Sequence, residues 1–331
     1  MTQQVFDIAD ASSSPPTLNH VRGNTRVVKQ LRTALDAHFN DRSTVNINSD
    51  PPAFPHTLLV GPPGLGKSML AGIIARELGG ELHEDMGQNL PTPGHLQGLL
   101  MLVEPEDCIF VDEIHELHPL VQTTLYRAIE ERKLFLSTRG SRDHNKVLLP
   151  KFCLIAASTD EWALSKPLLD RFKLILRLEH YSEDELAKLL QQRVLRLGWS
   201  VSAEAIRGIA KRGRGTPRLA MRLLEASRRM TRALDETEIT AANLALTCNI
   251  NQIDTLGFDI LEQNYLRLLN ESDVPIRLNI ISTRLGLPTR TIERIIEQDL
   301  IRLGFVTKDD SGRILTSKGK EHITENEEAK A

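Results

Sequence analysis

The chain has 331 residues, of which 26 % are charged and 40 % apolar, and its formal net charge is −3. These values are ordinary for a globular protein, and the length leaves room for two or three domains. A net charge so close to zero excludes binding of nucleic acid through overall charge, so any such contact must come from local basic patches.

The sequence also argues against a secreted or membrane protein. Its three cysteines, Cys108, Cys153 and Cys248, show no metal-ligand spacing and suit a reducing compartment as buried apolar groups. No apolar run approaches the roughly 18 residues that span a bilayer, and the N-terminus lacks the features of a secretory signal. We therefore expect a cytoplasmic protein without membrane association.

The first half of the chain predicts an α/β domain. Residues 1–16 end in a Ser/Pro-rich stretch and are expected to form a disordered tail. Residues 21–39 carry apolar side chains at helical spacing, and residues 40–55 are rich in Asn and Pro, which favours a loop. From 56 to 178, apolar strands alternate with helical patterns, which indicates a parallel sheet covered by helices.

A Gly-x-x-x-x-Gly-Lys-Ser pattern separates the apolar run 57–60 from the helical pattern that begins at Met69. In this context the glycines let backbone N–H groups turn toward phosphate oxygens, and the helix directs the positive end of its dipole at the same anions. The lysine then reaches the β and γ phosphates of ATP, and the serine hydroxyl ligates Mg²⁺. The alternative is a Gly/Pro-rich turn that matches by chance. The predicted nucleotide contacts are Gly61, Pro62, Pro63, Gly64, Leu65, Gly66, Lys67, Ser68 and Met69.

A second apolar strand, 108–111, ends in Asp112 and Glu113. After a phosphate loop, this is the position of a Walker B pair, in which Asp112 holds Mg²⁺ and Glu113 acts as general base toward the attacking water. The alternative is that the two acids cap the helix that follows, because acids favour helix N-termini.

Three further residues lie where they can contact a nucleotide. Thr159 is the last residue of the apolar strand expected over 151–159, and the strand ends of such a sheet face the ligand crevice; alternatively the strand simply ends in a turn there. Arg171 can reach the γ-phosphate of a neighbouring subunit, or else pair on the surface with a nearby acid such as Asp170 or Glu179. Arg218 stands in the first turn of a helix begun by Pro217, an unfavourable place for a cation, which indicates a task such as bonding a phosphate.

Residues 182–248 read as helical, and the C-terminal part predicts a winged helix. A helix over 278–285, a break at 286–288 and a second helix capped by Thr289 have helix-turn-helix spacing, and 305–315 reads as a β wing. Basic residues here suit phosphate contacts with DNA, although a protein-binding module with solvated arginines is the alternative. The predicted DNA contacts are Arg290, Arg294, Arg302, Lys308 and Arg313.

Taken in order, the phosphate loop, Asp-Glu-Ile-His at 112–115, Leu-Ile-Ala-Ala-Ser-Thr at 154–159, Pro-Leu-Leu-Asp-Arg-Phe at 167–172 and Arg-Gly-Thr-Pro-Arg at 214–218 resemble the motifs of AAA+ ATPases. More narrowly, residues 17–320 resemble the RuvB family, bacterial motors of Holliday-junction branch migration. The resemblance implies that Thr159 is sensor 1, Arg171 the arginine finger and Arg218 sensor 2. It also implies that Tyr181 lies near the adenine and that the chain forms a ring, a hexamer by family resemblance.

The chain departs from the family pattern at three places. Leu169 replaces the first arginine of the usual Pro-Leu-Arg-x-Arg-Phe, so Arg171 alone remains as a finger. Residues 21–24 replace the usual Phe-Ile-Gly-Gln, which weakens any adenine contact there. The hairpin expected over 134–149 corresponds to the one that docks the partner RuvA in the family. Its tip is polar and charged here, which makes it a poor hydrophobic docking site.

We therefore expect an AAA+ core over 17–178, a helical lid over 179–251, a winged helix over 255–323 and a short tail after it. The expected function is ATP hydrolysis coupled to movement along, or remodelling of, double-stranded or branched DNA. Two other functions stay open: a protein-directed AAA+ remodeller whose winged helix binds a protein, and a nucleotide-controlled switch with little turnover.

Overall fold

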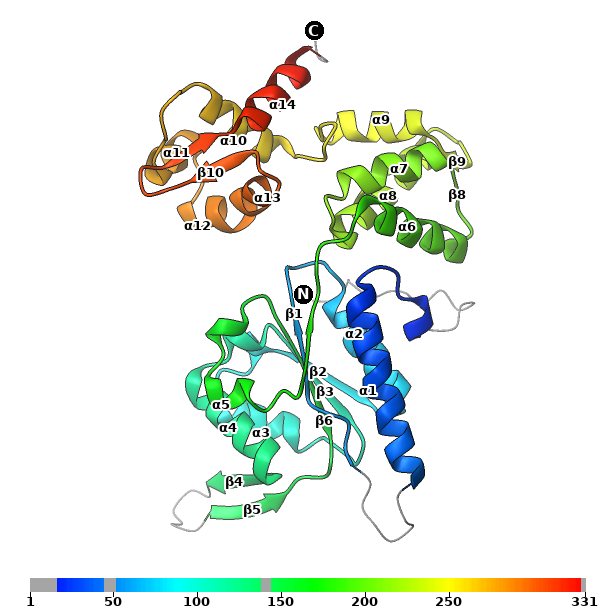
Figure 1. Ribbon diagram of the computed structural model, residues 1–331, viewed down its shortest axis with the longest axis vertical. Coiled ribbons are helices and arrows are strands. Elements are labelled where there is room, and N and C mark those ends of the chain that lie inside the picture. The colour runs from blue at the N-terminus through cyan, green and yellow to red at the C-terminus, as the bar shows by residue number, and fades with distance from the viewer. Residues whose placement is uncertain (1–16, 45–51, 138–143, 329–331) are drawn as a thin grey trace. The chain divides into compact units, whose positions relative to one another are not determined.

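The computed structural model describes residues 17–44, 52–137 and 144–328 (Figure 1). The tail expected over 1–16 and the tip of the hairpin, 138–143, lie outside the described residues. The chain divides into two compact units, one of residues 1–192 with 215–218 and the other of residues 193–214 with 219–331.

The first unit is built on a parallel sheet of five strands in the order β2-β3-β6-β1-β7. The central strands β3 and β6 are almost wholly apolar because both of their faces are covered, whereas the edge strand β2 carries polar side chains and is only partly buried. The register places Val60 beside both Ser158 and Arg177, so β1, β6 and β7 end at the same edge. The strands are β1 (Thr57–Val60), β2 (Leu82–Met86), β3 (Cys108–Asp112), β6 (Cys153–Ser158) and β7 (Leu174–Arg177).

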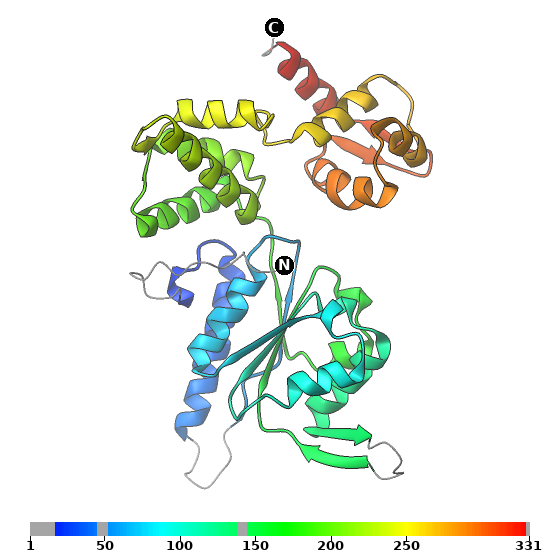
Figure 2. The same ribbon diagram turned by 180° about the vertical axis from the view of Figure 1, so that it is seen from behind.

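Helices cover both faces of this sheet. Figures 1 and 2 show α1 and α2 on one face and α3, α4 and α5 on the other. A core cluster that includes Leu58, Ile109, Leu125 and Leu154 fills the space between the sheet and the second group. The α/β expectation for this domain is confirmed. The helices are α1 (Thr25–Thr44), α2 (Lys67–Leu78), α3 (Pro93–Leu100), α4 (Pro119–Glu131) and α5 (Lys166–Leu169), with single 3₁₀ turns at Leu18–His20, Gly87–Asn89, Ile114–Glu116 and Glu161–Ala163.

Two details of the first unit differ from expectation or extend it. The first helix, α1, continues to Thr44, so the loop expected over 40–55 begins later than its Asn content indicated. Between α4 and β6 the strands β4 (Lys133–Ser137) and β5 (His144–Leu148) pair antiparallel as a hairpin outside the main sheet.

The second unit begins inside α6 (Glu183–Leu197) and continues with α7 (Ala203–Arg212), α8 (Pro217–Ala233) and α9 (Ala241–Ile250). These helices agree with the expected helical lid. A short parallel pair that the sequence pattern did not indicate, β8 (Ser200–Val201) with β9 (Glu238–Ile239), joins the loops on either side of α7 and α8.

The C-terminal part of this unit is a winged helix, as expected. Helix α11 (Leu278–Leu285) ends at Gly286, and the second helix runs as α12 (Thr289–Thr291), a π-helical turn at Ile292–Ile296 and α13 (Glu297–Arg302). Strands β10 (Val306–Lys308) and β11 (Arg313–Leu315) form the wing, and α10 (Ile260–Asn270) packs against them.

Two expectations about this module are corrected. Pro288, not Thr289, is the N-cap of α12, because Pro288 has extended backbone angles and Thr289 is already helical. After the wing, α14 (Ser317–Glu328) follows and contributes Ile323 to the module's core. The expectation of a tail that begins at 324 is therefore wrong for residues 324–328, which are helical. Among the residues that the structure describes, no helix is long and apolar enough to cross a bilayer.

Candidate active site

The phosphate loop lies between β1 and α2, at the strand ends shared by β1, β6 and β7. Gly66 caps α2 with a φ of 97°, a left-handed conformation that glycine adopts without strain. Gly64 has a φ of 81°, and a Cβ there would lie 2.9 Å from the Cβ of Arg218. The Gly61 amide donates to the carbonyl of Ser158 at 3.2 Å, which fixes the start of the loop to the end of β6.

Lys67 is a buried cation at the start of α2, only 6 % exposed. Its ammonium donates to the carbonyl oxygens of Gly61 at 2.7 Å and Pro62 at 3.1 Å, across the mouth of the loop. Burial lowers the pKa of Lys67, and the nearby carboxylates of Glu113 and Asp112 counteract this shift. A buried ammonium held by carbonyl oxygens at a helix N-terminus fits a phosphate group, whose negative charge would offset the cost of burial.

Ser68 and Asp112 meet as expected of Mg²⁺ ligands. The Ser68 hydroxyl donates to Oδ2 of Asp112 at 3.2 Å, and Oδ1 of Asp112 accepts from the Glu113 amide at 2.9 Å. Within the described ranges no group of three or more His, Cys, Asp or Glu side chains could hold a metal. The hydroxyl and carboxylate nevertheless fit Mg²⁺, which takes most of its ligands from water and substrate phosphates.

Glu113 follows β3 and has a φ of 49°, an uncommon conformation for a residue with a side chain. Although it is the N-cap of the 3₁₀ turn Ile114–Glu116, its carboxylate makes no capping hydrogen bond, so the capping alternative does not explain it. Oε2 of Glu113 instead accepts from the Thr159 hydroxyl at 3.3 Å and lies 3.3 Å from Nδ1 of His115. The carboxylate therefore faces the end of β6, next to the phosphate loop.

Residues 215–218 pack directly on this loop. The Arg218 amide donates to the Gly64 carbonyl at 3.3 Å, and the Arg218 charge lowers the pKa of Lys67, although less than burial does. Pro217 begins α8, as its fixed φ favours. The Tyr181 hydroxyl donates to the Leu65 carbonyl at 3.4 Å, and burial raises the pKa of Tyr181. Arg218 and Tyr181 thus both contact the loop through its backbone.

Arg171 lies apart from these groups, just after α5. Its guanidinium donates to Glu130 of α4 at 2.5 Å, so its partner is neither Asp170 nor Glu179. Leu169, at the position of the family's first arginine, packs against the core cluster, as an apolar replacement should.

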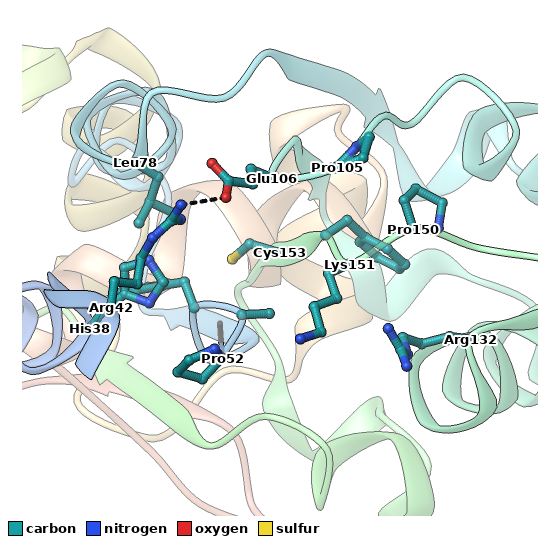
Figure 3. Close-up of a pocket in the computed structure, with 13 residues that line it drawn as sticks. His38, Arg42, Pro52, Leu78, Pro105, Glu106, Arg132, Pro150, Lys151 and Cys153 are labelled. Carbon is teal, nitrogen blue, oxygen red and sulfur yellow. Dashed lines mark hydrogen bonds and ion pairs between the residues drawn. The ribbon is translucent and has the colours of Figure 1, made fainter. Parts of the chain in front are cut away.

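A pocket of about 300 Å³ lies elsewhere in this unit, between the end of α1 and the loops before β1, β3 and β6 (Figure 3). Arg42 pairs with Glu106 on one side of it, and Lys151 and Arg132 lie on the other. Because Cys153, the first residue of β6, lines it, the pocket is at the opposite end of the strands from the phosphate loop. It is not the nucleotide site.

The predicted DNA contacts in the winged helix differ in how exposed their side chains are and in whether acids already pair with them. Arg290 and Arg294 are exposed on the second helix. Arg302 donates to Asp299 at 2.8 Å, and Lys308 donates to Glu293 at 2.9 Å, so both charges are partly engaged. Arg313 is the fifth predicted contact.

Arg313 is unsuited to a DNA contact, so the prediction for this residue is wrong. Its side chain is 8 % exposed and donates to the buried carboxylate of Glu297 at 2.8 Å. Although burial opposes it, bonding to Glu297 raises the pKa of Arg313. The sequence pattern put Arg313 on the wing but did not indicate that its face of β11 is buried.

Sequence reasoning also missed partners within the site. The Asp-Glu-Ile-His motif includes His115 but does not indicate its role, because its contact with Ser158 joins the turn after β3 to the end of β6, 43 positions away. Nothing in the sequence indicated Glu130 as the partner of Arg171. A charge pattern along α4 offers many acids and gives no means of choosing among them.

Family models match the chain along almost all of its length. Residues 14–178 match the Holliday junction DNA helicase RuvB P-loop domain, residues 181–254 the RuvB AAA lid domain and residues 255–324 the RuvB C-terminal winged helix domain. The order of these three matches follows the order of the expected domains.

Individual relatives give the same result. The chain is 34 % identical to the Holliday junction branch migration complex subunit RuvB of Neorickettsia sennetsu, over 97 % of this chain and 96 % of that protein. It is 36 % identical to the same subunit of Prochlorococcus marinus, over 93 % and 86 %. The solved structure of the Thermotoga maritima RuvB Holliday junction branch migration motor aligns with a TM-score of 0.79 at 32 % identity, covering 94 % of this chain and 98 % of that one. The chain therefore belongs to the RuvB family.

Proposed function

We propose that this protein is an ATP-driven motor that moves branch points in DNA, as the names of its relatives state for them. The observation that carries the proposal is the meeting of Lys67, Asp112, Glu113 and Arg218 around one phosphate loop. These side chains come from three separate segments: the start of α2, the end of β3 and the start of α8. A chance match of a single motif would not bring them together.

The side chains divide the work of hydrolysis as follows. Lys67 and the loop amides bind the phosphates of ATP, and Ser68 and Asp112 hold Mg²⁺, which would offset phosphate charge. Glu113 takes a proton from the attacking water. Thr159 keeps Glu113 oriented, and Arg218 senses the nucleotide from the first turn of α8.

Arg171 completes the site of a neighbouring copy in a ring, which we propose to be a hexamer. In support, its hydrogen-bond partner within the chain is Glu130 on α4 and not a group of the phosphate loop. An arginine supplied in trans stabilises the charge that develops during phosphoryl transfer, so hydrolysis depends on assembly. The resident partner Glu130 must release it when the copies join.

The winged helix over 255–323 contacts double-stranded or branched DNA through Arg290 and Arg294, whose exposure supports this role. A RuvA-type protein is the proposed second partner, docking on the β4–β5 hairpin. The polar tip on which the contrary expectation rested lies outside the described residues. We assign the ATPase domain to 17–178, the lid to 179–251 and the compartment to the cytoplasm.

Steady-state ATPase assays on linear, forked and four-way DNA test the proposal, with particle size measured in the same samples. We expect hydrolysis to rise most with four-way DNA and only in assembled particles. Glu113→Gln should lower turnover by about 10²- to 10⁴-fold, leaving a measurable residual rate, but keep ATP binding. A hydrolysis rate that does not change with DNA would contradict the motor function. A Glu113→Gln variant as fast as the wild type would contradict the assignment of Glu113 as general base.

A further inference from the structure

His115 lies in the 3₁₀ turn Ile114–Glu116, directly after the Walker B strand β3, and its side chain is 17 % exposed. Nδ1 of the imidazole is 3.1 Å from the Ser158 hydroxyl oxygen and 3.3 Å from Oε2 of Glu113. The other nitrogen, Nε2, lies 3.7 Å from a carboxylate oxygen of Glu116. One nitrogen of His115 thus faces both the proposed base and the end of β6.

The neighbours of Nδ1 decide which nitrogen carries a proton. The Glu113 carboxylate can only accept hydrogen bonds, so a bare Nδ1 would place two lone pairs against each other. Ser158 Oγ already accepts from the Asp160 amide at 3.0 Å and has a second lone pair to offer. Nδ1 therefore carries hydrogen and donates toward Ser158 and Glu113.

This arrangement fixes one oxygen of Glu113 and exposes the other. Thr159 and His115 both act on Oε2, and Oε1 makes no hydrogen bond or ion pair to any of the residues that the structure describes. Because the backbone of Glu113 is left-handed, its side chain enters the site from an uncommon direction and depends on such partners for its orientation. Oε1 is then the oxygen that meets water.

The same contact joins Glu113 to the phosphate loop. Ser158 is fully buried, and its carbonyl accepts the amide of Gly61, the first residue of the loop. A shift of the loop on nucleotide binding reaches Ser158 through this hydrogen bond, and His115 transmits it to Glu113. Thr159 also contacts the carboxylate, but among the described residues its side chain makes no hydrogen bond to the phosphate loop.

We propose that His115 is a positioning residue: its Nδ1–H orients the Glu113 carboxylate for water activation and ties that orientation to the phosphate loop through Ser158. The inference rests on the proposed role of Glu113 as general base. His115 itself does not exchange a proton with the reacting groups.

Paired substitutions test this role in the full chain assembled on duplex DNA. His115→Ala should lower kcat by about 10- to 100-fold, a part of what a general base contributes, and leave KM and ATP affinity within about twofold. The amide nitrogen of His115→Asn occupies the place of Nδ1 and should recover most of the rate. His115→Gln places its amide near Nε2 and should not recover it.

A double-mutant cycle separates positioning from a general structural effect. In the Glu113→Gln background His115→Ala should cost nothing more, because the group it orients is gone. The inference is overturned by equal rescue from Asn and Gln, by parallel loss of ATP affinity, or by an undiminished cost in the Glu113→Gln background. Wild-type turnover by Glu113→Gln alone would instead remove the base assignment itself, so the two failures are distinguishable.

Discussion

At the scale of single residues, function and stability conflict at Lys67. The ammonium is buried, its pKa is lowered by that burial, and its hydrogen-bond partners are two carbonyl oxygens. A folded chain without nucleotide therefore holds a cation that solvent would accommodate better. Functional sites often carry such a cost, because the group is arranged for its ligand.

Lys67→Met keeps the length of this side chain and removes its charge. We expect ATP affinity to fall by about 10- to 100-fold, the worth of a charge-assisted hydrogen bond, while thermal stability without nucleotide stays equal or rises. Calorimetric ATP titration and thermal melts measure the two effects, with exposed Lys29→Met as the control. A variant that melts lower but binds ATP normally would show that Lys67 is structural.

At the scale of elements, the winged helix exposes two cations of its second helix and buries a third on its wing. Arg290 and Arg294 are exposed around the π-helical turn Ile292–Ile296, whereas Arg313 of the wing bonds to Glu297 of α13 inside the module. Substituting these residues should therefore have different effects.

Arg290→Ala and Arg294→Ala should each weaken duplex binding and reduce the slope of log affinity against log salt by about one. Arg313→Ala should instead destabilise the winged helix, because buried Glu297 would lose its nearest cation and keep only Lys308, at 3.9 Å. Duplex titrations across salt concentrations and thermal melts of the full chain separate the two outcomes. Unchanged salt slopes for both exposed arginines would argue for a protein-binding module.

Helix α14 is attached by a buried pair that makes its stability depend on pH. His322 lies 2.8 Å from Oδ2 of Asp254, and both side chains are buried. Burial alone raises the pKa of Asp254, but hydrogen bonds from His322 and from the amides of Phe258 and Leu256 outweigh it and lower the pKa. A carboxylate with a lowered pKa stabilises the fold fully above its unfolded pKa of about 4, and the contribution is lost as pH falls through the folded value.

His322→Ala should therefore destabilise α14 by about 1–3 kcal/mol at pH 7, and by less once pH falls through the lowered pKa of Asp254. Hydrogen exchange of α14 amides, corrected for intrinsic rates at each pH, measures the difference from wild type. Exposed Thr324→Ala on the same helix is the control. A difference that stays constant down to about pH 3 would exclude Asp254 as its origin.

At the scale of the whole molecule, the boundary between the two compact units falls inside the Arg-Gly-Thr-Pro-Arg motif at 214–218. Residues 215–218 belong to the first unit, and Arg214 belongs to the second. Arg214 donates to Glu262 of α10 at 2.6 Å, stacks on Phe258, and accepts at its carbonyl from Arg302. Arg218, whose amide bonds to the phosphate loop, is therefore only four positions along the chain from Arg214, which is attached to the winged helix.

Arg214→Met should uncouple these functions. We expect ATP affinity to persist while stimulation by DNA and branch movement are lost, with a stability cost of about 3–5 kcal/mol because Glu262 stays buried without its partner. Arg214→Met with Glu262→Gln should recover stability but not coupling. Recovery of branch movement together with stability would show that Arg214 serves folding alone.

Assembly supplies the last test at this scale, because the proposed site needs two copies. Arg171→Ala and Glu113→Gln should each be nearly inactive alone. In a mixed ring, a copy with intact Glu113 can meet a neighbour with intact Arg171, so mixing should restore part of the ATPase rate. Arg127→Ala, a paired surface arginine of α4, is the control for Arg171→Ala. Mixtures that stay inactive would place Arg171 in the site of its own chain or outside catalysis.

The sequence by itself determined the features that neighbouring residues encode. The phosphate loop, the acids after β3 and the helix-turn-helix break each depend on backbone conformations set within a few positions. Glycines and prolines in the sequence indicate such conformations, because they allow or impose particular backbone angles. The tertiary structure alone decided which distant side chains meet: His115 with Ser158, Arg171 with Glu130, and Arg313 with buried Glu297. Such contacts depend on sheet order, register and which face is covered, and many charged residues compete for each partner until packing excludes all but one.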